Sequence, residues 1–99
     1  MLLVFEFDPV KSAGNKDKHG IDFVDAQALW HDKYGLTVTA NGIGEERLAL
    51  IALLGEKLWL AVHTLRGGRI RIISVRRARE LERHHYEDHK RRRIRQGGR

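Results

Sequence analysis

Cysteine is absent from this chain of 99 residues, which excludes a disulfide framework and any metal site built on thiolates. Long apolar runs are missing too, because no stretch approaches the roughly 18 residues that cross a bilayer. The first apolar run, residues 2–5, meets Glu6 too early for a signal peptide and predicts a strand instead. We therefore expect a cytoplasmic protein that does not engage a membrane.

Signatures of several enzyme classes are also missing. The chain has no His-Glu-x-x-His motif and no visible Ser-His-Asp arrangement. His84, His85 and His89 lie close together, but the arginines around them oppose a divalent cation, so we expect no metal and no cofactor. Neither an internal repeat nor a linker is visible, which indicates one domain over residues 1–89, followed by a basic, frayed tail at 90–99.

Positive charge is concentrated in the last third of the chain. Residues 1–65 carry 6 Lys and Arg against 9 Asp and Glu, a net charge of −3, whereas residues 66–99 carry 13 against 4, a net charge of +9. Arginine stays charged and presents a planar fork of donors that fits phosphate oxygens. The run 66–82 therefore predicts a surface that holds a polyanion, and RNA is the polyanion we expect.

Two helices are predicted in the N-terminal third. Asp8 caps the first, which ends before Gly20. Asp22 caps the second, which ends near Trp30. The side chains that we expect to face inward from the second helix are Phe23, Ala26, Leu29 and Trp30.

Alternating apolar residues predict strands after these helices. A short strand is expected at 36–39 and three longer strands at 47–54, 57–65 and 69–75, joined by connections of hairpin length into an antiparallel meander. In the last strand, alternation places Ile70, Ile72, Ser74 and Arg76 on one face. A final helix over 78–95 has so thin an apolar stripe that we expect a partner to help hold it. The predicted fold is α+β: a small antiparallel sheet, two N-terminal helices packed on it, and a C-terminal helix.

Cleavage of RNA without metal needs few groups: a base for the 2′-hydroxyl, cations for the phosphorane, and an acid for the leaving 5′-oxygen. His63 near a strand end is one candidate, with Arg66, Arg71 and Arg76 as cations near it. Lys18 and His19, at the end of the first helix, can reach the same rim. Their structural alternatives remain open, since His63 also suits a half-buried sheet position, and basic residues are routine at a helix C-terminus.

Binding without turnover is a further possibility. Tyr34, Trp59 and Tyr86 can stack on unpaired bases beside the arginines, and Arg69 and Arg77 add contacts to RNA. Such a chain would be a single-strand RNA module rather than an enzyme. The residues alone do not choose between holding RNA and cutting it.

An ordered set of short motifs covers nearly the whole chain and resembles the BrnT toxins of bacterial type II toxin–antitoxin systems. In this family a Ser or Thr caps the last helix, and Arg79 stands in its place here. The matching segments are residues 5–8, Lys11 and Asn15, residues 18–21 with Phe23 and Ala26, residues 44–47, Thr64 with Arg66 and Gly67, residues 71–78, and Glu82 with Tyr86.

The resemblance implies a RelE-like fold and a ribonuclease that uses no metal. It also implies a BrnA-like antitoxin with a ribbon-helix-helix domain, a hetero-oligomeric complex, and contact with operator DNA only through that complex. It does not divide the roles of base and acid. Arg47, taken alone, also suits a surface ion pair with Glu45 or Glu46. The positions that the resemblance singles out are Lys18, His19, Arg47, Arg66, Arg71 and Arg76.

Overall fold

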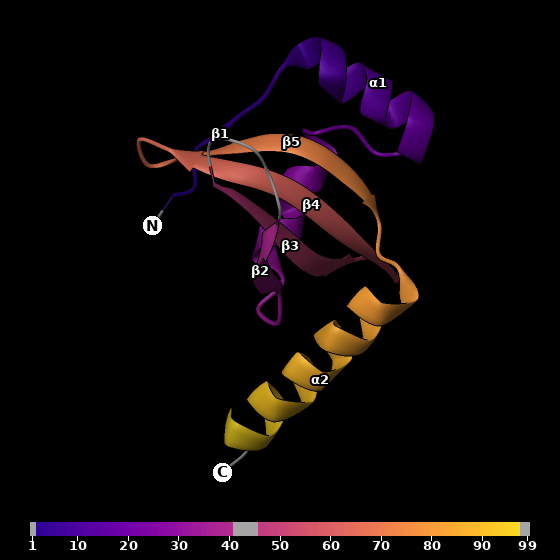
Figure 1. Cartoon of the computed structure of the whole chain (residues 1–99), viewed down its shortest axis with the longest axis vertical. Helices are drawn as coiled ribbons and strands as arrows, with labels where there is room; N and C mark the ends of the chain where they lie inside the picture. Colours follow the sequence, from indigo (N-terminus) through magenta and orange to yellow (C-terminus); the bar gives the residue numbers. More distant parts are fainter. Residues whose placement is uncertain (1, 41–45, 98–99) are drawn as a thin grey trace.

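A five-stranded sheet forms the centre of the protein in a computed structural model that describes residues 2–40 and 46–97 (Figure 1). The strands lie in the order β1-β5-β4-β3-β2. Within the described residues, no helix is long and apolar enough to cross a membrane. The elements are β1 (Phe5–Glu6), α1 (Pro9–His19), the 3-10 helix η1 (Asp25–His31), β2 (Leu36–Ala40), β3 (Arg47–Leu54), β4 (Lys57–Arg66), β5 (Arg69–Arg77) and α2 (Glu80–Gly97).

The predicted meander is confirmed, because β3, β4 and β5 pair in antiparallel order through two short turns. The sheet as a whole is mixed, however, which corrects the expectation of an antiparallel sheet. β1 pairs with the outer edge of β5 in parallel, with Phe5 opposite Ile70 and Glu6 opposite Arg71. A parallel pair needs a long connection, and the whole chain between β1 and β5 supplies it.

The N-terminal third follows its predicted helix signals with one difference. The Asp8 side chain accepts a hydrogen bond from the Val10 N–H at 2.8 Å, and Gly20 ends α1 with φ 84°. The second predicted helix is a 3-10 helix, preceded by a turn in which Asp22 accepts from the Asp25 N–H at 2.8 Å. One α-helix and one 3-10 helix therefore stand where two helices were expected. The predicted inward residues Phe23, Ala26 and Leu29 are buried, and Trp30 is half-buried.

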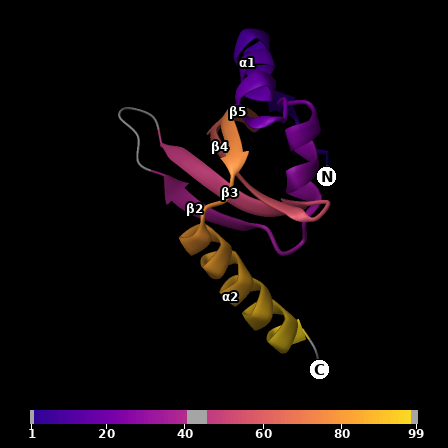
Figure 2. The same cartoon turned by 90° about the vertical axis from the view of Figure 1, so that its right-hand side faces the viewer.

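The sheet has two faces with different covers, and Figure 2 shows η1 on one side and α2 below the other. We call the first the η1 face and the second the α2 face. The buried residues of the η1 face are Ile21, Phe23, Ala26, Leu29, Leu50, Ala52, Trp59, Ala61, Ile70, Ile72 and Val75. Those of the α2 face are Ala49, Ile51, Leu58, Leu60 and Tyr86.

A β-bulge in β5 shifts the alternation that the sequence predicted. Ile72 pairs with His63 and Ser74 pairs with Val62, so Ile73 has no partner in the register. The prediction that Ile70, Ile72, Ser74 and Arg76 share one face is therefore wrong. After the bulge, Val75 joins the core of the η1 face, and Ser74 and Arg76 lie on the α2 face.

α1 covers the part of β5 that lies beyond β1. The Asn15 amide donates to the carbonyls of Ile21 at 2.8 Å and Val75 at 3.0 Å, and its oxygen accepts from the Val75 N–H at 3.2 Å. One side chain thus partners both backbone groups of a strand residue at the sheet edge. This edge is closed to further strand pairing.

Polar contacts anchor α2, for which the sequence predicted only a thin apolar stripe. Tyr86 is 2% exposed, and its hydroxyl donates to the Asp32 carboxylate at 2.7 Å. Glu82 accepts from both terminal nitrogens of Arg76 at 2.9 and 2.8 Å, and from the Arg79 N–H at 2.7 Å. The last bond is half of a capping box, and it compensates for the missing Ser or Thr at position 79.

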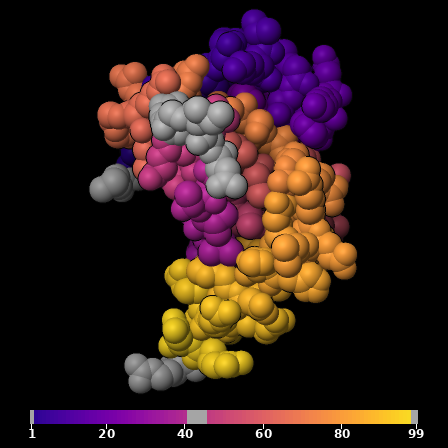
Figure 3. Space-filling model, in the orientation of Figure 1, coloured from indigo at the N-terminus to yellow at the C-terminus, as the bar shows by residue number. Residues whose placement is uncertain are grey.

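The second half of α2 extends away from the rest of the protein (Figure 3). The helix runs to Gly97, so the residues expected to form a frayed tail from Lys90 onward are helical over 90–97. Within the helix, residues 80–97 carry six basic and four acidic side chains. The basic charge of this segment thus lies along a helix.

Candidate functional site

Four polar side chains form a row across the α2 face, one from each of four neighbouring strands. In the register, Glu6 lies opposite Arg71, and Arg71 lies opposite Thr64. Arg47 comes one step beyond the pair Leu48–His63, which places it beside Thr64. Since neighbouring strands lie about 4.8 Å apart, the row spans about 14 Å.

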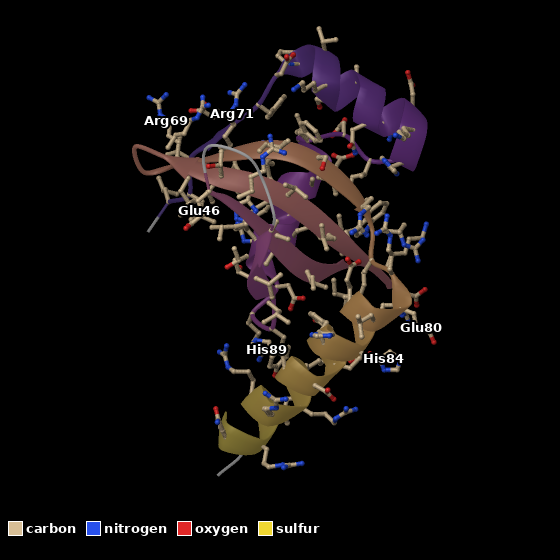
Figure 4. All side chains as sticks on the ribbon, viewed as in Figure 1. Glu46, Arg69, Arg71, Glu80, His84 and His89 are labelled. Carbon is tan, nitrogen blue, oxygen red and sulfur yellow. The ribbon has the colours of Figure 1, made fainter. Side chains whose placement is uncertain are left out.

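Two arginines share one carboxylate at the β1 end of this row. Nη1 of Arg71 donates to Oε2 of Glu6 at 3.0 Å, and Nη1 of Arg69 lies 3.8 Å from Oε1 of the same residue. Figure 4 shows Arg69 and Arg71 projecting side by side near the β4–β5 hairpin. The Arg69 side chain is 63% exposed and that of Arg71 is 33% exposed. One carboxylate does not neutralise two guanidiniums, so this corner is positive.

Arg47 stands at the other end of the row and is half-buried. Its Nε is buried and has no hydrogen-bond partner, and among the described residues no carboxylate pairs with it. The expected ion pair with Glu46 does not form, and Glu45 lies outside the described residues. The neighbouring Thr64 hydroxyl donates to the Glu46 carbonyl at 3.0 Å. An arginine that no described carboxylate neutralises is suited to an anion that arrives from solution.

Arg66 extends the positive surface toward the hairpin. It pairs in register with Arg69, and alternation from Thr64 places it on the α2 face. The turn between them uses Gly67 and Gly68 at φ 53° and 81°, which lets the strands reverse within two residues. The structure therefore brings together four of the predicted arginines: Arg47, Arg66, Arg69 and Arg71.

Arg76 and Arg77 have other surroundings. Arg76 lies on the α2 face, but its hydrogen bonds with Glu82 raise the pKa of the guanidinium, against the effect of burial, and the same bonds lower the pKa of Glu82. Arg77 lies on the η1 face, 5.6 Å above the ring centre of Trp59. That indole is 7% exposed and belongs to the core, so it does not offer a stacking surface for bases.

The position of His63 is at odds with the catalytic role that we expected for it. The side chain is 3% exposed, lies on the η1 face, and packs edge-on against Trp30 with 5.0 Å between ring centres. Burial lowers the pKa of the imidazole, opposed by a contact of 3.0 Å between Nδ1 and the Ala61 carbonyl. Alternation explains the outcome, because a neighbour of Thr64 along β4 must point to the opposite face.

Lys18 and His19 are not brought to the row either. They form the last turn of α1, which contacts β5 through Asn15 at Val75. In Figure 1, α1 starts on the β1 side and runs toward the opposite end of the sheet. Its last turn therefore lies away from Arg71. Lys18 is exposed and His19 is half-buried.

Glu6 is the member of this row that the sequence analysis did not single out. Its signal was a carboxylate inside an otherwise apolar strand, in the motif at residues 5–8. The side chain is 27% exposed and lies directly beside Arg71. Within residues 2–40 and 46–97 the structure has no group of three or more His, Asp or Glu side chains that could hold a metal ion. The row itself sets one carboxylate, that of Glu6, among guanidiniums.

A known protein family matches most of this chain. The family model described as the ribonuclease toxin, BrnT, of type II toxin–antitoxin systems matches residues 7–82, which is most of the chain. None of the curated proteins matches the chain. The matched segment includes β3, β4 and β5 with Arg47 and Arg71, whereas Glu6 lies just before it.

Proposed function

The chain belongs to the BrnT family of ribonuclease toxins of type II toxin–antitoxin systems, and on that premise we propose that it cleaves RNA on the α2 face without a metal ion. The observation that carries the proposal is the row Glu6, Arg71, Thr64 and Arg47. It joins a partly exposed carboxylate to guanidiniums on one face of the sheet. The row supplies the base and the cations that attack of the 2′-hydroxyl on the phosphate requires, and water supplies the acid.

Glu6 is the proposed general base. Its carboxylate takes the proton of a ribose 2′-hydroxyl, and the 2′-oxygen forms a bond to the adjacent phosphorus. The bond from phosphorus to the 5′-oxygen breaks, and that oxygen takes a proton from water. The products are a 2′,3′-cyclic phosphate and a 5′-hydroxyl, and Glu6 returns its proton to solvent.

Arg71 and Arg47 have the role of stabilising the phosphorane. Arg71 touches Glu6 at 3.0 Å, so a phosphate beside Arg71 lies within reach of the base. Arg47 brings a guanidinium charge beside Thr64 that no described carboxylate neutralises, and this charge attracts the phosphate. Arg66 and Arg69 hold the flanking phosphates. Arg76 is a positioning residue in this proposal, because its fork is occupied by Glu82 and fixes α2.

An antitoxin partner accompanies a toxin of this class. We propose that it is BrnA-like, with a ribbon-helix-helix domain, and that operator DNA is bound only through the complex. The proposal includes a RelE-like relationship of the fold, which the α+β architecture and the mixed five-stranded sheet permit.

One observation favours a second candidate function, binding of RNA without cleavage. Of the six histidines, none lies on the row, and His63 is buried on the opposite face. A chain that lacks an effective base would hold RNA through its arginines, with log affinity falling linearly with log salt concentration. In that case Glu6 would only orient Arg71.

The test is incubation of the purified protein with labelled RNA in EDTA, followed by analysis of the fragment ends. Glu6→Gln should lower the cleavage rate by about 10²–10⁴-fold, as expected for loss of a general base. Arg71→Ala should lower it by about 10²–10³-fold through loss of transition-state stabilisation. Arg83→Ala, which removes an exposed arginine of α2, is the matched control and should keep full activity.

Three outcomes separate the alternatives. Cyclic-phosphate ends that depend on Glu6 and Arg71 support the proposed mechanism. Full activity of Glu6→Gln together with loss in Arg71→Ala would remove Glu6 as the base, and inhibition by EDTA would remove the metal-free mechanism. Intact RNA that is bound in a salt-dependent way would establish the binding module instead.

A further inference from the structure

The two edges of the sheet differ in how their outward backbone groups are paired. At one edge, β1 pairs with the start of β5, and Asn15 of α1 occupies the backbone groups of Val75. At the other edge, β2 is the outermost strand and pairs only with β3. The sequence of β2, Leu-Thr-Val-Thr-Ala, contains no charged residue and no proline, and its register with β3 has no bulge. It therefore lacks the devices that normally prevent another strand from adding to an edge.

The backbone groups that β2 presents at this edge follow from the register. The Leu53 N–H of β3 bonds to Asp32, which precedes β2, whereas the Glu46 carbonyl faces Thr64 of β4. Odd-numbered residues of β3 thus direct their backbone groups toward β2. The residues of β2 that pair with them, such as Val38 opposite Ala49, direct their own backbone groups toward β3. The N–H and carbonyl groups of Thr37 and Thr39 therefore point to the free edge.

An apolar groove lies beside this edge, between β2 and α2. Its volume is about 270 Å³, and its lining is Val38, Ile51, Leu60, Leu81, Glu82 and His85. Leu81 is 69% exposed and Val38 is 37% exposed, although both are apolar. The side chains of a strand added at β2 would alternate, and those on the α2 face would enter this groove.

The wider end of the groove is lined in part by basic side chains. It measures about 430 Å³, and His84, His89 and Arg92 contribute to its wall. Figure 4 shows His89 on the side of α2 toward β2. The Nε2 of His89 is buried and has no hydrogen-bond partner within the described part of the chain. The acid in this wall, Asp88, is paired with Arg91. A carboxylate from outside would meet the exposed guanidinium of Arg92 here.

We propose that an extended segment of the antitoxin pairs with the free edge of β2, with apolar side chains in the groove and acidic side chains against His89 and Arg92. This inference rests on the toxin–antitoxin function proposed above. Backbone bonds at Thr37 and Thr39 supply the pairing, and the two ends of the groove select apolar and acidic residues in turn. The partner surface lies at the opposite edge of the sheet from Glu6 and Arg71, on the strand next to the one that carries Arg47.

A second copy of the chain is a poorer occupant of this edge. An antiparallel pair of β2 strands would bring two copies of α2 toward each other. Residues 89–97 of each copy carry five basic side chains and no acidic one. Repulsion between like charges opposes such a dimer, whereas an acidic segment is attracted.

The test compares Thr37→Pro with Thr37→Ala in binding to the purified antitoxin encoded beside the toxin. Proline removes the outward N–H of Thr37 and leaves the bonds between β2 and β3 in place, and alanine removes only the side chain. We expect Thr37→Pro to weaken binding at least 10-fold and Thr37→Ala to bind as the unaltered chain does. Leu81→Lys should weaken binding as well, whereas Leu65→Lys, at a similarly exposed leucine on β4, should not.

Cleavage of RNA by the same variants separates this inference from the proposed function. Thr37→Pro that still cleaves RNA but escapes neutralisation by the antitoxin supports the docking surface. Unchanged affinity of Thr37→Pro and Leu81→Lys overturns it, whatever the ribonuclease assay gives. A free toxin that is dimeric, and becomes monomeric on Thr37→Pro, would show that a second copy occupies the edge and would also overturn it.

Discussion

Replacing Asn15 with alanine should strongly destabilise the protein. The Asn15 side chain is 8% exposed and makes hydrogen bonds of 2.8, 3.0 and 3.2 Å with Ile21 and Val75. Alanine leaves one N–H and two carbonyls without partners at the edge of β5. Each buried group left unpaired costs about 1–3 kcal/mol, and taking the low end because water can enter gives a total of about 3 kcal/mol. That is a large part of the 5–15 kcal/mol that typically stabilises a domain.

Urea unfolding measured by circular dichroism gives the magnitude, and hydrogen exchange gives the location. With about 4–8 °C lost per kcal/mol for a domain of this size, the melting temperature should fall by about 12–24 °C. The Val75 amide should exchange faster than amides in β3. Ser12→Ala is the matched control on α1, since it removes the single bond to the Phe23 N–H at 2.9 Å and should cost only about 1 kcal/mol. If Asn15→Ala costs no more than Ser12→Ala, the idea that this side chain closes the sheet edge is refuted.

The attachment of α2 gives two further predictions. A double-mutant cycle of Arg76→Ala and Glu82→Ala, measured by urea unfolding, should yield a coupling of about 1–2 kcal/mol, because the pair is bidentate and partly buried; additive losses would contradict the pairing. Burial alone would raise the pKa of Asp32, but hydrogen bonds from Leu53, Tyr86 and Tyr34 outweigh it and lower that pKa. A lowered pKa contributes stability above the unfolded value of about 4, and this contribution is lost as pH falls through the folded pKa. Stability between pH 6 and pH 3 should therefore fall less in Asp32→Asn than in the unaltered protein, and parallel profiles would contradict it.

The elements of this fold were predictable where the local signals are strong. Asp8 and Gly20 mark the ends of α1 because a side-chain oxygen and a residue at positive φ are needed there. Two short turns with glycine fixed the meander. The parallel placement of β1 has no local signal, since it depends on which edge of the finished sheet is open. The bulge at Ile73 was equally hidden, because one unpaired residue leaves an apolar run unchanged.

The candidate site was predictable in part for the same reason. The arginines were visible by charge, and Arg66, Arg69 and Arg71 do gather on one face. His63 looked equally suitable, but its face follows from alternation relative to Thr64, and its burial depends on Trp30 from a distant segment. Glu6 became a candidate only when parallel pairing placed it beside Arg71. Contacts between distant segments decide such roles, and no spacing along the chain reports them.

The extra residue at Ile73 limits how the length of this sequence can vary. It exchanges the faces to which the later side chains of β5 point, so that Val75 fills the core while Arg76 reaches Glu82 on α2. Deleting one residue here would put a guanidinium in the place of a core valine and detach the helix. The turn of the β4–β5 hairpin, which ends five residues earlier at Gly68, faces solvent and can accept a longer loop. Lineages of this toxin should therefore gain or lose residues at Gly67 and Gly68, and keep the count between Arg71 and Arg76 fixed.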